Sequence, residues 1–117
     1  ILAAIALPAY QDYIARSQVT TGLADIRGGV TAFEEIINRG TPSVYTNVDI
    51  GLAQTTTRCS PITVTPGPDG TIDCALEGNP KVNPYNITLE RNSATGTWNC
   101  TASAGLDPKY LPNGCTQ

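Results

Sequence analysis

The residues with the most distinctive chemistry in this chain of 117 residues are four cysteines, Cys59, Cys74, Cys100 and Cys115. None of them forms a Cys-x-x-Cys pair and the sequence has no histidine, so the usual zinc-site spacings are absent. An even number of cysteines in a small chain is typical of disulfides formed in an oxidising compartment. Among the alternative pairings, the spacing favours Cys59–Cys74 and Cys100–Cys115, which close two consecutive loops of equal length.

The composition argues against catalysis and against nucleic-acid binding. Without histidine, the chain lacks the commonest general base and the commonest metal ligand. The adjacent carboxylates Glu34 and Glu35 would point about 100° apart on a helix, so we interpret them as a solvated face. The sequence holds no nucleophile–base pair, metal cluster or phosphate loop, and we expect no catalytic, cofactor or metal site. The net charge of −3 disfavours nucleic acid as a direct ligand, because phosphate binding depends on Lys and Arg.

The cysteines lie in the second of two regions that differ in composition. Residues 1–39 contain one of the nine prolines and predict helix, whereas residues 40–117 hold all the cysteines and the other prolines. A chain of this length forms a single structural unit. We expect an N-terminal helix with a projecting half at 1–18 and an amphipathic half at 19–39, followed by a globular head over 40–117.

The run from Ile1 to Ala9 carries no charge and no hydrogen-bonding side chain. It is too short to span a bilayer by itself, since a spanning helix needs about 20 apolar residues. We expect it to continue a longer apolar helix, the alternative being a buried N-terminal core helix. Pro8 removes one helical hydrogen bond, but the spacing of Asp12 and Arg16 indicates that the helix resumes.

The amphipathic half carries one apolar stripe at helical spacing. Its members are Val19, Leu23, Ile26, Val30, Phe33 and Ile37. Gly40 and Pro42 then predict where the helix ends. A continuous helix over 1–39 would be about 58 Å long, whereas a head of about 80 residues should be about 25 Å across. The helix must therefore project beyond its own head.

Residues 40–117 predict an antiparallel sheet that covers this stripe. A connection over 41–58 contains a short helical or extended piece near 48–52. Four alternating segments follow, and the predicted strands are 61–65, 71–76, 85–90 and 97–102. The predicted fold class is α+β, with a long N-terminal α-helix packed on a four-stranded antiparallel sheet and a disulfide-bounded C-terminal loop.

Two segments of the chain resemble a known family. Residues 1–18, ILAAIALPAYQDYIARSQ, resemble the N-terminal helix of type IV pilins of the type IVa class. Residues 98–115, WNCTASAGLDPKYLPNGC, resemble the disulfide-bounded C-terminal loop of Pseudomonas-like major pilins. The resemblance covers the two ends of the chain and implies the type IV pilin fold for the whole.

The resemblance also implies a function. It implies the major structural subunit of a type IV pilus filament that serves surface adhesion and twitching motility. The expected location is the bacterial cell surface, with an inner-membrane pool before assembly and with N-terminal methylation upstream of Ile1. The implied partners are further copies of the chain, the inner-membrane assembly machinery and the prepilin peptidase, with a host glycan or a phage as outside ligands.

The same resemblance assigns roles to individual residues. Filament assembly and membrane contact fall to Ile1, Leu2, Ile5, Leu7, Pro8, Tyr10, Tyr13 and Ile14. A receptor-contacting, partly apolar loop surface falls to Leu106, Asp107, Pro108, Lys109, Tyr110, Leu111 and Pro112. Pro8 marks a point where the helix unwinds at little cost. Burial of the four large aliphatic side chains at 1–7 between copies would contribute about 6–12 kcal/mol per subunit.

Ordinary structural roles and other protein classes are alternatives to these assignments. Tyr10 and Tyr13 suit ordinary helix packing as well as a membrane interface, and the C-terminal disulfide also serves to fix the last segment on the sheet. A pseudopilin of a type II secretion system shares the N-terminal helix, but Cys100 and Cys115 argue against it. The net charge disfavours a DNA-uptake (competence) pilin, and a membrane-anchored enzyme lacks any catalytic constellation.

Overall fold

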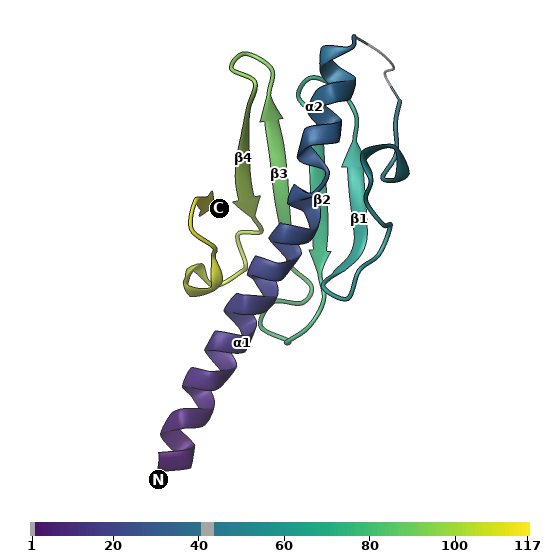
Figure 1. Ribbon diagram of the computed structural model, residues 1–117. Coiled ribbons are helices and arrows are strands. Elements are labelled where there is room, and N and C mark those ends of the chain that lie inside the picture. The colour runs from purple at the N-terminus through teal and green to yellow at the C-terminus, as the bar shows by residue number, and fades with distance from the viewer. Residues whose placement is uncertain (1, 41–43) are drawn as a thin grey trace.

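The computed structural model describes residues 2–40 and 44–117, with side chains from residue 7 onward within those ranges. A helical rod lies diagonally across one face of a sheet, and its N-terminal part extends well beyond the strands (Figure 1). The molecule measures 61 × 26 × 19 Å along its principal axes. In chain order the elements are α1 (Leu2–Arg27), α2 (Val30–Asn38), the short 3-10 helix η1 (Val48–Ile50), β1 (Cys59–Thr65), β2 (Thr71–Leu76), β3 (Asn86–Asn92), β4 (Thr97–Ala102), the 3-10 helix η2 (Pro108–Tyr110) and β5 (Cys115–Thr116).

The sheet has five strands in the order β1-β2-β3-β4-β5. Strands β1 to β4 form the antiparallel meander that the alternation predicts. The prediction of four strands is wrong in one respect, because β5 adds a short parallel strand beside β4. In this register Cys115 lies opposite Cys100, so the predicted disulfide and the strand pairing hold the same two residues together. Two residues are too few to show alternation, which is why β5 leaves no sign in the sequence.

The helical rod is interrupted at Gly28-Gly29, so the predicted continuous helix over 1–39 is wrong at this point. A tight backbone turn closes α1, and α2 begins after Gly29. A Cβ atom on Gly29 would lie 2.8 Å from Leu52 Cδ1, so the missing side chain lets the connection around η1 approach the rod. Pro8, by contrast, lies inside α1 without ending it.

The core lies between the rod and the inner face of the sheet. Of the predicted stripe, the buried members are Val19, Leu23, Ile26 and Phe33, and the partly buried ones at its edge are Val30 and Ile37. They belong to one cluster with alternate strand residues, which include Ile72, Cys74, Leu76, Ile87 and Leu89. Each fully buried aliphatic side chain contributes about 1.5–3 kcal/mol. This packing holds the rod on the sheet in spite of its glycines.

A polar cluster around Glu34 fastens α2 to the sheet. The Glu34 carboxylate pairs with Arg91 of β3 and accepts a hydrogen bond from Trp98 Nε1 at 2.8 Å. The bond from Arg91, and after it that from Trp98, lowers the pKa of the Glu34 carboxyl. Its neighbour Glu35 is exposed and pairs with Arg39. The expectation of a solvated face is therefore wrong for Glu34, because strand β3 carries a nearly buried arginine to it.

Replacing Glu34 with glutamine should lower the free energy of unfolding near neutral pH by about 1.5–3 kcal/mol, the usual value of a hydrogen bond to a charged group. The folded state lowers the pKa of Glu34, so its stabilising effect is present above the usual carboxyl pKa and is lost as pH falls through the lowered one. Urea unfolding at a series of pH values should therefore show the E34Q deficit shrinking on acidification.

The matched control for this experiment is Glu35→Gln, one residue away and exposed. It should change the free energy of unfolding by less than about 0.5 kcal/mol, as is usual for an exposed helical ion pair. Equal effects of the two variants, or an E34Q deficit that does not depend on pH, would contradict this interpretation.

Helix α1 comes closest to the sheet at Gly22, beside the first disulfide. The structure pairs Cys59 with Cys74, as the spacing predicts. A Cβ atom on Gly22 would lie 2.7 Å from Leu76 Cδ2 and 3.2 Å from Cys74 Sγ. Glycine is therefore required here for the close approach of a helix to a disulfide, and its cost in helix propensity is a consequence of that packing.

Gly22→Ala should destabilise the protein by roughly 1–3 kcal/mol, because overpacking of the core outweighs the gain of about 1 kcal/mol in helix propensity. Gly28→Ala is the matched control, since its Cβ would have no neighbour closer than 3.7 Å. That variant should be neutral or more stable by up to about 1 kcal/mol. Thermal or urea unfolding measures both, and a G22A protein as stable as G28A would show that the helix does not pack this closely.

Candidate functional site

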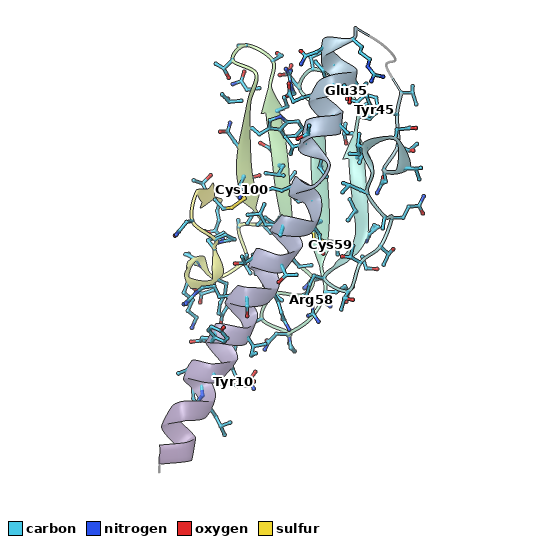
Figure 2. The ribbon with its side chains drawn as sticks, in the orientation of Figure 1. Tyr10, Glu35, Tyr45, Arg58, Cys59 and Cys100 are labelled. Carbon is cyan, nitrogen blue, oxygen red and sulfur yellow. A yellow bond between two sulfur atoms is a disulfide. The ribbon has the colours of Figure 1, made fainter. Side chains whose placement is uncertain are left out.

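The part of α1 that extends beyond the head exposes large apolar side chains. Leu7, Tyr10 and Tyr13 are 59%, 59% and 63% exposed. Pro8 is also exposed, and Ile14 is half-buried where the helix reaches the head. Figure 2 shows Tyr10 on the bare stretch of helix, away from the strands. Four of the predicted assembly residues are therefore left exposed by the head, and the fifth, Ile14, is partly covered.

The other three predicted assembly residues are only partly accounted for. Ile1 lies outside the described residues, and Leu2 and Ile5 belong to α1 by their backbone while their side chains lie outside the description. Within residues 2–40 and 44–117, no helix combines the length and the hydropathy needed to cross a membrane. The same part of the chain contains no group of His, Cys, Asp or Glu residues placed to hold a metal ion.

A polar latch centred on Asp12 ties the helix to the C-terminal segment where α1 leaves the head. The Asp12 carboxylate accepts a hydrogen bond from the Tyr110 hydroxyl at 2.9 Å. The same carboxylate lies 3.4 Å from Lys109 Nζ and 3.6 Å from Lys81 Nζ. One turn further along, Arg16 Nε donates to the Lys109 carbonyl at 3.0 Å. Asp12 and Arg16, whose spacing predicted that the helix resumes after Pro8, thus hold the C-terminal segment against α1.

The latch shifts the pKa values of its charged members. The hydrogen bond from Tyr110, and after it the charges of Lys109 and Lys81, lowers the pKa of the Asp12 carboxyl. The charge of Asp12 in turn raises the pKa of Lys109. Because the folded state lowers the pKa of Asp12, the latch is complete at neutral pH and is lost only as pH falls through that lowered value.

The segment closed by the Cys100–Cys115 disulfide is packed against α1. Leu106 is fully buried and Tyr110 is 2% exposed, so the expectation that they form part of an apolar outer surface is wrong. Of the other predicted loop residues, the exposed ones are Asp107, Pro108 and Lys109, and the partly buried ones are Leu111 and Pro112. The short helix η2, capped by the Asp107 side chain, fixes the turn from which Tyr110 reaches the helix. Among the predicted receptor residues 106–112, the accessible ones are therefore those of the turn at 107–109.

A groove of about 410 Å³ lies between α1 and the C-terminal segment. Its lining residues are Arg16, Thr20, Leu23, Ala24, Arg27, Leu111, Pro112 and Asn113. A second hollow of about 370 Å³ adjoins it, and Arg27 lines both. The groove is not evident from the sequence, because its two walls come from opposite ends of the chain. The sequence feature that could have indicated the helix wall of the groove is the helical spacing of Arg16, Thr20 and Ala24 beside the buried stripe.

Comparison with known proteins places these features in context. Residues 15–116 match the family model of the pilin that builds bacterial filaments. The chain is 37% identical to fimbrial protein Q of Moraxella bovis, across all of this chain and 87% of that protein. It is 35% identical to a fimbrial protein of Pseudomonas aeruginosa, across 98% and 85% of the two, and 34% identical to the type IV major alpha-pilin of Moraxella bovis, across 100% and 87%. The crystal structure of the Cs1 pilin chimera superimposes with a TM-score of 0.73 at 26% identity, covering 89% of this chain and 98% of that one.

The latch makes a prediction for Tyr110→Phe. Loss of the hydroxyl should raise the pKa of Asp12 toward the ordinary value, because this hydrogen bond is the largest cause of the shift. Nuclear magnetic resonance titration of the Asp12 carboxyl measures the pKa directly. Tyr85→Phe is the control, since that ring is partly buried and lies outside the latch. An Asp12 pKa that is the same in Y110F and in the unaltered protein would contradict the latch.

Proposed function

This chain belongs to the pilin family of bacterial filament proteins, and from that premise we propose that it is the major structural subunit of a type IV pilus. The observation that carries the proposal is the uncovered apolar surface at Leu7, Tyr10 and Tyr13. Among the described residues, the head contacts α1 from Gln11 onward and leaves these three side chains exposed. Further copies of the same helix are the chemically matched partner.

The energetics favour a polymer over a closed pair. Removing one large apolar side chain from water contributes about 1.5–3 kcal/mol, so several such residues per copy make assembly strongly favourable. In our proposal neighbouring helices lie side by side and staggered along their length, so each helix presents different faces to different neighbours and the contacts are heterologous. Heterologous contacts that do not close into a ring produce an open helical fibre. The fibre would place the helices along its axis and the heads outside.

Surface adhesion and twitching motility follow as roles of such a fibre. The relatives named fimbrial proteins and major pilins support a location on the bacterial surface. We propose an inner-membrane pool of unassembled copies, served by assembly machinery and a prepilin peptidase. For contact with a host glycan or a phage, the exposed turn at Asp107, Pro108 and Lys109 is the accessible part of the predicted receptor loop, and Lys109 Nζ within it also pairs with Asp12. The disulfide between Cys100 and Cys115 favours a major pilin over a secretion pseudopilin.

The test is to express Leu7→Asp from the protein's own gene in a bacterium that carries a type IV pilus assembly system. Fibres counted by negative-stain electron microscopy should be lost, because a carboxylate would have to be buried between copies without a partner. Leu7→Ile is the matched control, since it keeps the apolar volume, and it should form fibres as the unaltered protein does.

An immunoblot of whole cells separates failed assembly from loss of the protein. The head of L7D should fold normally, because Leu7 is largely exposed in the single copy. Absence of fibres from the unaltered protein, or normal fibres from L7D, would count against the proposed function.

A further inference from the structure

The groove between α1 and the C-terminal segment has an unusual combination of apolar walls and cationic rims. Leu23, Ala24 and Leu111 line it together with Arg16 and Arg27, and its lining contains no carboxylate. Of the other cations, Arg39 and Arg91 pair with glutamates, Lys81 and Lys109 pair with Asp12, and Arg58 donates to the Glu77 backbone carbonyl at 3.2 Å. Among the described residues, no acidic side chain forms a salt bridge with either groove arginine. The groove therefore suits an apolar side chain that carries a carboxylate beside it.

The head presents one such feature on its own surface. Val48, the first residue of η1, is 75% exposed, and Asp49 follows it. The Asp49 carboxylate accepts hydrogen bonds from the Thr46 backbone N–H at 2.7 Å and from the Thr46 hydroxyl at 3.1 Å. These bonds fix the position of the carboxylate, which belongs to the residue after the exposed valine. Within the described part of the head, the other large apolar side chain of similar exposure is Val44, at 74%, and no carboxylate adjoins it in sequence.

We propose that the groove receives Val48 and Asp49 of a second copy of this chain, with the valine between the apolar walls and the carboxylate beside Arg27. The proposal rests on the filament function proposed above and deepens it by naming a contact between heads. We call Val48 and Asp49 the tip. Charge complementarity between the cationic groove and the acidic tip supports the contact.

The placement of the two surfaces fits a polymer. Figure 1 shows the connection that contains η1 on one side of the helical rod and the C-terminal segment, in yellow, on the other side. A copy therefore presents its tip away from its own groove, and the contact must be made between copies. Since tip and groove differ, the contact is heterologous and propagates along a fibre. A contact this small is weak alone, but the packed helices would hold the heads at a high effective concentration.

Charge reversal tests the pairing. Arg27→Glu would place an acid in the groove opposite the native Asp49, and Asp49→Lys would place a cation opposite the native Arg27. Each variant alone should reduce the yield of sheared pili by about tenfold or more, because attraction becomes repulsion. The double variant should recover the yield to within about twofold, because the tip then again meets a groove of opposite charge.

Val44→Lys is the control, because it adds a cation at an exposed residue of the same connection outside the proposed tip. It should leave pilus yield unchanged. Normal yields from R27E and D49K, a failure of the double variant to recover, or an equal loss from V44K would overturn the contact. If the unaltered protein forms fibres while these variants have no effect, only this inference fails; if the unaltered protein forms none, the proposed function fails with it.

A cross-link provides a readout that does not depend on yield. Ala24 is exposed and lines the groove, so Ala24→Cys combined with Val48→Cys should form disulfides between copies in sheared pili. Non-reducing electrophoresis should then show a ladder of linked subunits. The pair Ala24→Cys with Val44→Cys is the control and should remain monomeric. A monomer from the first pair, or the same ladder from both pairs, would contradict the contact.

Discussion

The close packing of α1 on the sheet around Gly22 determines which part of the helix the head covers. Gly22 faces a disulfide and Leu76, so the later half of α1 packs closely on the sheet. The stripe of Val19, Leu23 and Ile26 is buried as a result. The sheet ends before the helix does, so the apolar side chains of Leu7, Tyr10 and Tyr13 stay exposed. The same element is thus a core component over one half and an uncovered apolar surface over the other, and the proposed polymer follows from that difference.

Two polar clusters secure the covered part of the rod near its two ends. Asp12 ties α1 to Tyr110 of the C-terminal segment, and Glu34 ties α2 to Arg91 and Trp98 of the sheet. In both clusters the folded state lowers the pKa of a carboxyl group. Both are therefore intact at neutral pH and weaken together under strong acid. The C-terminal disulfide supports the Asp12 cluster. It holds the C-terminal segment beside β4, and Asp12 contacts that segment.

Features with local signals were predictable from the sequence, and features made by distant residues were not. Helical spacing in α1, alternation in β1 to β4 and the equal cysteine separations each lie within a short stretch of chain. The close approach at Gly29 involves Leu52, and the ion pair of Glu34 depends on Arg91, which comes from a strand far along the chain. Leu106 and Tyr110 are apolar residues in a predicted loop, so the sequence suggested an exposed surface. Their burial depends on how that loop docks on α1. The groove was hidden for the same reason, since one wall is helix and the other is the end of the chain.

In the fibre that we propose, the helices lie inside and the heads surround them. A map of the assembled pili by electron cryomicroscopy, at a resolution that shows side chains, examines this arrangement directly. We expect Leu7, Tyr10 and Tyr13 to be enclosed among the α1 helices of neighbouring copies near the fibre axis. A map in which these side chains face solvent, with copies joined through their heads alone, would contradict it.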